Sequence, residues 1–368
     1  MRIVQVIYSL TQGGAERFVV DLSNELAKED EVYLLTFRKD SEENNGFYKS
    51  EIADKVRYIN LPLKKGFRFA DVLTINKLIL EINPDVIHAH SNAIYYFLLK
   101  SIFSNQTKVF HTIHNDAFFD GRKKIPSLIR KYFYKFKKVI PITISDKSNE
   151  SFRQFYKMEV SSLIYNGRMR PSKTNLFNNV QHEIESIKKT SDDLVFIHIS
   201  RFNETQKNHL LLLKVFNKLC QNYDNLVLII IGRDYDKQEA DKLLHIKNPQ
   251  TFFLGNKVNV ADYLYCSNAF CLTSNFEGLP ISLLEALACG VVPICTPVGG
   301  IVDVVTDGKT GYLSEEINEE SYYIAMEKFV KNPNKIQKKD LIELFETSFS
   351  IESCAKNHRQ LYEEILNS

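Results

Sequence analysis

Two glutamates in the second half of the chain stand where a phosphate or a hydroxyl-rich ligand would be bound. Glu277 lies in a polar turn after the apolar run 269–273, and Glu285 follows eight residues later. Pro280 and Gly290 mark the start and the end of a helix between them, since proline favours the first turn and glycine follows the last. The start of such a helix presents backbone N–H groups to an anion. We expect both carboxylates to accept hydrogen bonds from the hydroxyl pairs of one ligand.

The stretch EGLPISLLEALACGVVPICTPVGG, residues 277–300, resembles the E-x7-E motif of the retaining glycosyltransferases of family 4. This family includes sucrose synthases and bacterial mannosyl- and glucosyltransferases. The spacing of the two glutamates is weak evidence by itself, and an isolated Glu285 would be read as a solvated helix residue. The glycines, prolines and leucines in register with the glutamates are stronger, and Gly299 and Gly300 permit close backbone approach. The resemblance covers nearly the whole chain and is clearest over 191–313.

The resemblance implies an α/β protein of the GT-B fold, with two Rossmann-like doubly wound domains facing across a cleft. The second domain would bind a nucleotide sugar and the first an acceptor. The residues implied for the nucleotide sugar are Gly14, Arg201, Lys207, Asn256, Lys257, Val258, Glu277, Gly278, Leu279, Pro280 and Glu285. The residues implied for catalysis are Glu277, His114, Arg201 and Lys207, and those for the acceptor are Gly13, His90 and Asn115.

Two cations follow the apolar run 194–200, in the loop SRFNETQKNH. Arg201 can grip a diphosphate with two hydrogen bonds, and Lys207 adds a mobile point charge. The alternative is a pair of solvated loop cations. In the resembled family, the matching residues stabilise the leaving nucleoside diphosphate, although the spacing to Lys207 is one residue longer here than is usual. The resemblance further implies that Glu277 holds sugar hydroxyls, Glu285 holds ribose hydroxyls and the backbone of 256–258 meets the base.

The first half begins with a strand over 2–8, a turn TQGGAER and a helix, which is how a doubly wound domain opens. The turn lacks the G-x-G-x-x-G pattern, which disfavours a nicotinamide cofactor and a dehydrogenase. Gly13 and Gly14 can place N–H groups against a diphosphate or an acceptor, unless they form a plain tight turn. Further strand-like runs alternate with helical segments, as in a mostly parallel sheet.

Three histidines, His90, His111 and His114, fall at the ends of predicted strands. Ligands of parallel sheets gather at these ends, although a lone histidine there is more often structural. The T-x-H-N context of His114 resembles a family histidine whose ring and carbonyl approach the donor sugar. His90 has the weaker claim.

Residues 122–138, RKKIPSLIRKYFYKFKK, hold eight basic residues and no acidic one. Apolar residues recur at helical spacing in this segment, so it predicts an amphipathic basic helix that can lie on an anionic membrane surface. The alternative is that the apolar stripe packs on the sheet while the lysines are solvated. No recognised nucleic-acid-binding motif accompanies the segment, and we expect no nucleic-acid partner.

We expect no metal and no cofactor other than the nucleotide-sugar substrate. Asp234 and Asp236 form a D-x-D, which binds divalent metal in other transferases, but here it follows IIIGR, where the resembled family has an ordinary turn. The six cysteines all lie in the second half without a C-x-x-C pair, which favours reduced thiols over disulfides or zinc.

Length and hydropathy predict a protein of two domains that remains in the cytoplasm. The 368 residues suit two domains of ordinary size. No apolar run approaches the roughly 20 residues of a spanning helix, and the start of the chain lacks a signal-peptide pattern. The basic helix adds peripheral attachment to the inner face of the plasma membrane. We expect domains over 1–167 and 192–349, a polar linker over 168–191, and a final helix within 350–368 that crosses back to the first domain.

These observations predict a retaining glycosyltransferase that moves a hexose or an N-acetylhexosamine from a nucleotide sugar, with UDP favoured over GDP. The acceptor would be a saccharide, linked to a polyprenyl diphosphate, in surface polysaccharide or glycoconjugate biosynthesis. Two alternatives remain open. A nucleotide-sugar epimerase of similar architecture would work without an acceptor, and a noncatalytic protein would bind the nucleotide sugar without transferring it.

Overall fold

The computed structural model describes residues 1–41, 45–64, 68–103, 106–114, 117–120, 124–159, 162–236 and 238–368. The chain folds into two compact units. One consists of Met1–Met169 together with Phe349–Ser368, and the other of Arg170–Ser348.

The first unit is built on a parallel sheet of short, mostly buried strands. Its strands are β1 (Arg2–Ile7), β2 (Glu31–Thr36), β3 (Arg57–Asn60), β4 (Val86–His90), β5 (Lys108–Ile113), β6 (Ile140–Thr143) and β7 (Ser162–Leu163). They lie in the order β3-β2-β1-β4-β5-β6-β7, and neighbouring strands pair in parallel. Because β1 has β2 on one side and β4 on the other, the strand order reverses there, which is where doubly wound sheets bind ligands.

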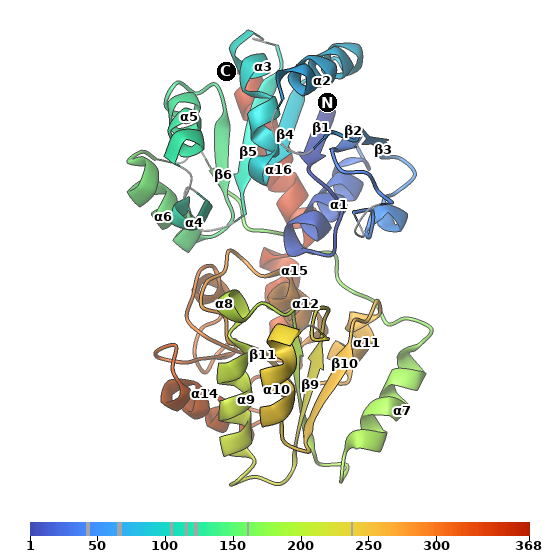
Figure 1. The fold of residues 1–368 in the computed structure, drawn as a ribbon, viewed down its shortest axis with the longest axis vertical. Coiled ribbons are helices and arrows are strands. Elements are labelled where there is room, and N and C mark those ends of the chain that lie inside the picture. Colours follow the sequence, from blue (N-terminus) through green and yellow to red (C-terminus); the bar gives the residue numbers. More distant parts are fainter. Residues whose placement is uncertain are drawn as a thin grey trace. The chain divides into compact units, whose positions relative to one another are not determined.

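Helices connect these strands, and the last helix of the chain joins them. They are α1 (Gly14–Leu26), α2 (Phe69–Ile82), α3 (Leu98–Phe103), α4 (Ala117–Asp120), α5 (Lys124–Lys135), α6 (Asp146–Tyr156) and α16 (Ile351–Leu366), with 3-10 turns η1 (Lys49–Glu51) and η2 (Ser91–Tyr96). The red helix α16 lies among the blue and green elements of this unit and packs against α1 (Figure 1).

The second unit repeats the same plan. Its strands are β8 (Leu194–Ile199), β9 (Leu226–Ile231), β10 (Thr251–Gly255), β11 (Ala269–Leu272), β12 (Val292–Cys295) and β13 (Tyr312–Leu313), in the order β10-β9-β8-β11-β12-β13. Its helices are α7 (Phe177–Ile187), α8 (Glu204–Lys207), α9 (His209–Leu219), η3 (Gln238–Ala240), α10 (Asp241–Ile246), α11 (Val260–Tyr265), α12 (Ile281–Cys289), α13 (Ile301–Val304), α14 (Glu319–Lys331) and α15 (Lys338–Ser348). The predicted α/β class, with two doubly wound Rossmann-like domains, is therefore confirmed.

The segment 168–191, predicted as a polar linker, contains a helix. Residues 177–187 form α7, which buries Val180 and Ile184 and packs against α11. Phe177 and Ile187 lie on the same face and are half-buried, so four apolar residues recur at helical spacing here, and the prediction of a linker overlooked this signal. The strand β13 was also not predicted, because two residues are too few to show alternation.

Two segments of the first unit that are far apart in the sequence, around Gly167 and around Ser350, pack closely through their backbones. A Cβ atom at Gly167 would lie 2.5 Å from Cβ of Cys354 and 2.8 Å from the carbonyl oxygen of Ser350. Glycine is therefore required where these two parts of the chain run side by side.

The neighbouring Arg168 ties this segment to α1. Its backbone N–H donates to the carbonyl of Phe349 at 3.0 Å, and its Nη1 donates to Oδ2 of Asp21 at 2.6 Å. Both side chains of the ion pair are buried, and Arg17 lies 3.3 Å from the other oxygen of Asp21. A buried pair of this kind is costly to break, because the remaining charge is left without its partner.

We expect Arg168→Met to destabilise the first unit by about 3 kcal/mol, the lower end for a broken buried pair, because Arg17 still contacts Asp21. Urea unfolding of the variant and the parent protein measures this loss. Arg170→Met is the matched control: Arg170 pairs with Glu346 at 3.2 Å, but both side chains are exposed. It should cost about 1 kcal/mol or less. Equal losses in the two variants would contradict the structural role of the Arg168 pair.

Candidate functional site

Glu277 occupies the turn between β11 and α12, and its carboxylate is buried. Oε1 accepts hydrogen bonds from Nζ of Lys207 at 2.5 Å and from Oγ of Ser274 at 2.7 Å. Oε2 accepts a longer bond from Nε2 of Gln206, at 3.4 Å. A carboxylate oxygen can accept more than one hydrogen bond, so Oε2 retains capacity for a ligand hydroxyl. One oxygen is thus fixed inside the fold and the other is available.

The short helix α8 sets the position of Lys207. The side chain of Asn203 accepts from the N–H of Gln206 and caps the helix at its start, while Asn208, at φ 51°, ends it in the left-handed conformation. The hydroxyl of Thr273 donates to the carbonyl of Lys207 at 3.0 Å. The loop after β8 is therefore fastened to the end of β11, which brings Lys207 and Glu277 together despite the extra residue in the loop.

The turn after β12, which holds Gly299 and Gly300, packs against the backbone of Glu277 and Gly278. Gly299 has φ of +52°, and a Cβ atom there would lie 2.0 Å from the carbonyl oxygen of Glu277. The N–H of Gly300 donates to the carbonyl of Gly278 at 2.6 Å. Only glycine can occupy position 299, so the predicted close backbone approach is made to the turn that holds Glu277.

Arg201, the other predicted cation, is exposed at the end of β8. It forms no hydrogen bond or ion pair through its side chain with any described residue. The two predicted cations therefore differ: Lys207 is held by Glu277, while Arg201 is available to an anion from solution.

Helix α12 begins at Ile281, and Pro280 is its N-cap rather than its first helical residue. The neighbouring Gly278 and Leu279 are buried. Glu285 lies half-buried in the second turn of α12. Burial, together with the nearby charge of Glu285, raises the pKa of the Cys289 thiol to about 12.

The loop after β10 exposes the residues predicted to meet a base. Asn256 is exposed, and the side chain of Val258 is 81% exposed. Lys257 lies 5.3 Å from the ring centre of Tyr263, with Nζ 3.9 Å from a carboxylate oxygen of Glu183. An exposed valine in a loop has no packing role here, so the loop can lie along a flat apolar ligand surface.

In the first unit, His114 ends a row of imidazoles that runs back into the core. Its Nε2 lies 3.0 Å from Nδ1 of His90, and Nε2 of His90 lies 2.8 Å from Oε1 of Gln5. His90 follows His88 in the row, at 4.2 Å between ring centres. The amide oxygen of Gln5 only accepts, so His90 carries its proton on Nε2 and its Nδ1 accepts from His114. Neutral His114 then presents Nδ1 as an acceptor.

The row continues to the last helix of the chain. The hydroxyl of Tyr362, in α16, lies 2.6 Å from Nδ1 of His88. The other ring nitrogen of His88, Nε2, lies 2.7 Å from the hydroxyl of Thr112. The amide nitrogen of Gln5 donates to the same tyrosine hydroxyl at 3.5 Å. Sequence reasoning missed Gln5, His88 and Tyr362. A glutamine inside the apolar run RIVQVIY is the signal that could have revealed the first.

The assignment of His90 to the acceptor stays a prediction, and the structure gives its ring no direct access to a ligand. His90 is fully buried, and both of its ring nitrogens are hydrogen-bonded to Gln5 and His114. It is the last residue of β4 and faces into the core, so it acts on a ligand only through His114. The predicted acceptor residue Asn115 lies outside the described residues.

The turn before α1, which holds Gly13, is contacted by a carboxylate of the protein itself, that of Glu16. Gly13 is the N-cap of α1, and the carboxylate of Glu16 folds back so that Oε2 lies 2.3 Å from where a Cβ of Gly13 would be. The hydroxyl of Thr11 donates to the same carboxylate at 3.2 Å. A negative charge at a helix start is stabilising, so Glu16 competes there with any ligand anion. Gly14 remains exposed.

Burial keeps most of the histidines uncharged. The pKa values of seven are lowered from 6.5, in each case chiefly by burial: His88, His90, His111, His114, His198, His209 and His358. The pKa falls to about 3 for His114 and to about 4 for His358. The folded protein therefore binds fewer protons than the unfolded chain below pH 6.5.

We expect the free energy of unfolding to be level only between about pH 7 and pH 8, below the titration of the buried thiols, and to fall as the pH drops from 6.5 towards 5. Each buried imidazole contributes up to about 1.4 kcal/mol per pH unit in this direction, so a total loss of at least about 3 kcal/mol is expected. Urea unfolding at half-unit pH steps measures the slope. His245→Gln, which changes an exposed histidine, should leave it unaltered. A level profile down to pH 5 would show that these imidazoles are protonated in the folded state.

Comparison with known proteins assigns both units. The model described as Glycosyltransferase Family 4 matches residues 12–168, and the model described as Glycosyl transferases group 1 matches residues 179–343. An uncharacterized glycosyltransferase of Methanocaldococcus jannaschii is 30% identical over 235 residues, which cover 60% of this chain and 58% of that protein's own length.

The GalNAc-alpha-(1->4)-GalNAc-alpha-(1->3)-diNAcBac-PP-undecaprenol alpha-1,4-N-acetyl-D-galactosaminyltransferase of Campylobacter jejuni is 26% identical over 325 residues, or 85% of this chain and 84% of that protein. The crystal structure of Anabaena HepE in complex with UDP-glucose has the same fold, with a TM-score of 0.79 at 16% identity over 99% of this chain and 100% of that one. Since the two family models match the two units in turn, the chain belongs to the glycosyltransferases in which a family 4 domain is followed by a group 1 domain.

Proposed function

We propose that the chain is a retaining glycosyltransferase that moves a hexose or an N-acetylhexosamine from a nucleotide sugar to a saccharide acceptor. The observation that carries this proposal is the buried carboxylate of Glu277, which is held by Lys207 while Arg201 is exposed in the same loop. A fixed carboxylate next to cations is the arrangement that a sugar diphosphate needs. All three residues follow neighbouring strands of the second unit at their carboxyl ends, where such sheets bind ligands.

In the proposed reaction, Arg201 and Lys207 bind the diphosphate and offset the charge that grows on it as it leaves. Lys207 has three N–H donors and gives one to Glu277, so it can serve both groups. Stabilisation of the leaving group counts most in the transition state, where its charge is largest. Oε2 of Glu277 accepts from a sugar hydroxyl, and Glu285 accepts from the ribose.

Retention follows if the acceptor attacks from the face that the diphosphate leaves. The bond from the anomeric carbon to the phosphate oxygen breaks, and a bond to the acceptor oxygen forms. The acceptor proton passes to the departing phosphate oxygen, so an α-linked donor gives an α-linked product. Nδ1 of His114, left as an acceptor by the hydrogen bond to His90, receives a hydrogen bond from a donor-sugar hydroxyl.

No metal is required in this proposal, because the two cations and the start of α12 supply the positive charge. Asp234 is 3.7 Å from the guanidinium of Arg233, a contact that satisfies part of its charge within the chain. Among the described residues, no group of three or more histidines, cysteines or acidic residues is arranged to hold a metal ion. A chelator should therefore leave turnover unchanged.

The donor nucleotide and the acceptor are proposed from the relatives. The Campylobacter relative is named for an undecaprenyl-diphosphate-linked acceptor, and the Anabaena structure contains UDP-glucose. We take UDP as the nucleotide and a polyprenyl-diphosphate-linked saccharide as the acceptor, in surface polysaccharide or glycoconjugate biosynthesis.

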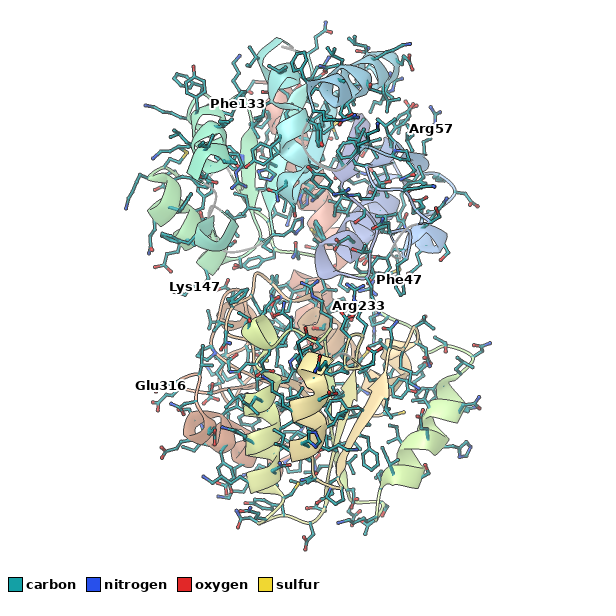
Figure 2. The ribbon with its side chains drawn as sticks, in the orientation of Figure 1. Phe47, Arg57, Phe133, Lys147, Arg233 and Glu316 are labelled. Atoms are coloured by element: carbon teal, nitrogen blue, oxygen red, sulfur yellow. The ribbon has the colours of Figure 1, made fainter. Side chains whose placement is uncertain are left out.

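Helix α5 supports attachment to a membrane surface. Its apolar stripe is exposed, which disfavours the alternative in which that stripe packs on the sheet. The exposed residues are Ile125, Leu128, Ile129 and Tyr132 of the helix and Phe136 directly after it. Phe133, labelled in Figure 2, comes from the same helix and is buried instead. Lys135, Lys137 and Lys138 are exposed near the stripe. Residues 122–123 of the basic segment lie outside the described residues.

We propose that α5 and these lysines hold the protein to the anionic inner face of the plasma membrane. An amphipathic helix with exposed lysines gains from both apolar burial and attraction to anionic lipids. No helix in the described ranges has the length and hydrophobicity to cross a membrane.

The first test measures nucleotide release from UDP- and GDP-sugars, with and without an extract of lipid-linked acceptors. We expect release that needs both one donor and the extract. Arg201→Gln should lower the rate at least about 100-fold, because it removes charge at the leaving group. Glu277→Gln should lower it comparably by removing the sugar contact.

Glu315→Gln is the control for charge loss, since Glu315 is exposed in the same unit. Its rate should match the parent protein. Wild-type rates in both Arg201→Gln and Glu277→Gln would contradict the assigned site. Epimerised sugar without nucleotide release would favour an epimerase, and nucleotide binding without any turnover would favour the noncatalytic alternative.

The membrane proposal is tested by reversing three lysines together, Lys131→Glu, Lys135→Glu and Lys138→Glu. Each lysine near an anionic surface contributes about 1 kcal/mol, so binding to vesicles of phosphatidylglycerol should fall by about 100-fold or more. Sedimentation with the vesicles measures it. The matched variant reverses Lys55, Lys77 and Lys157, which are exposed elsewhere in the first unit. Equal binding of the two triple variants would rule out α5 as the attachment site.

A further inference from the structure

The first unit has a cavity of about 380 Å³ that the assigned site residues do not line. Its walls come from residues that follow four adjacent strands, β1, β2, β3 and β4. Those on which the argument depends are Tyr8, Phe37, Arg38, Lys64, Asn92 and Tyr96. The cavity lies at the carboxyl edge of the sheet, where the strand order reverses between β1 and β4, and ligand sites of doubly wound sheets form at such reversals. Its volume is within the roughly 300–1,000 Å³ of ligand pockets.

Three aromatic rings form one wall of this cavity. The ring of Phe37 is 5.0 Å from that of Tyr96 and 5.8 Å from that of Tyr8, measured between centres. Phe37 and Tyr96 are buried, and Tyr8 is half-buried. Aromatic faces provide a rigid apolar surface for the C–H faces of a sugar ring, while the amide of Asn92 can bind hydroxyl groups.

Two cations stand at the same cavity without an acidic partner among the residues that the structure describes. Arg38 lies over the ring of Tyr8, at 6.0 Å, and Lys64 is exposed. Neither forms an ion pair with a described residue. The nearby Asp40 is engaged elsewhere, since Oδ1 accepts from the hydroxyl of Tyr58 at 2.6 Å and Oδ2 lies 3.0 Å from Nζ of Lys49.

The wall that carries Arg38 is fixed by its backbone. The carbonyl of Tyr8 accepts from the N–H groups of both Phe37 and Arg38, each at 2.9 Å. The carbonyl of Arg38 accepts from the side chain of Asn60 at 2.6 Å. Because the backbone of Arg38 is already fixed, less conformational entropy is lost when its guanidinium binds an anion.

We infer that this cavity binds a saccharide that carries a carboxylate or a phosphate group, with the sugar on the aromatic wall and the acidic group between Arg38 and Lys64. The inference rests on the proposed function and on the family resemblance, which implies that the first unit receives the acceptor, and it makes that acceptor an acidic saccharide. A planar guanidinium matches either anion with two hydrogen bonds. A neutral sugar would bring no anion to two cations that have no acidic partner in the described part of the chain.

Binding is measured by calorimetry on the full chain without any donor. The probes are uronic-acid and phosphorylated mono- and disaccharides, each compared with its neutral counterpart, and inorganic phosphate. We expect at least one acidic class to bind about tenfold or more tighter than its neutral counterpart, a difference that falls as the salt concentration rises. Which class binds identifies the acidic group. No preference for any acidic probe overturns the inference, and so does inorganic phosphate that binds as tightly as the best saccharide.

Arg38→Gln combined with Lys64→Gln should remove the preference while leaving nucleotide binding unchanged. Lys77→Gln changes an exposed lysine of α2 and should keep it. If the double variant does not fold, the salt dependence of the parent protein decides, because a preference that does not weaken with salt contradicts the two-cation site. Nucleotide release without an acidic preference defeats this inference alone. An acidic preference without release from any donor defeats the proposed transferase and leaves the saccharide site standing.

Discussion

A carboxylate that is taken out of water must be paired or hydrogen-bonded, and Glu277 imposes this requirement on the second unit. Lys207 comes from the loop after β8, Ser274 from the end of β11, and the required Gly299 from the turn after β12. Three loops therefore meet at one residue, the first two at its carboxylate and the third at its backbone. Loss of the contact with Lys207 would leave a buried charge uncompensated, so the geometry of the site and the stability of this sheet edge depend on that contact.

In the first unit, the side chains at the carboxyl ends of β4 and β5 are neutral and are held by hydrogen bonds to one another. The buried histidines stay neutral, and each passes one hydrogen bond to the next, from His114 through His90 to Gln5. The chain closes on Tyr362, which α16 supplies from the end of the sequence. The final helix is therefore part of the core behind His114. A neutral, hydrogen-bonded row fixes the tautomer of that histidine, which a solvated imidazole would not do.

Local patterns were enough to predict both sheets, because buried parallel strands are short apolar runs separated by turn residues. They also revealed the glycine turn at 299–300, since few other residues tolerate such an approach. Contacts between distant segments were not predictable in this way. Nothing in the local sequence shows that Lys207 pairs with Glu277, or that both nitrogens of His90 are taken. The periodicity of 122–138 likewise defines a stripe, but only the fold shows that Leu128 and Tyr132 face outwards.

The two cations of the second unit have separate tasks in the proposed reaction, and their environments explain why. Lys207 already pairs with a carboxylate, so Glu277 offsets part of its charge, but a diphosphate meets an ammonium that is held in place. Arg201 has no such partner among the described residues, so its charge is fully available, although its exposure weakens each contact by screening. In this proposal, Lys207 positions the diphosphate and Arg201 supplies most of the attraction. Exchange of the two residue types would reverse this division, because a guanidinium held by Glu277 would present its fork to the carboxylate rather than to the leaving diphosphate.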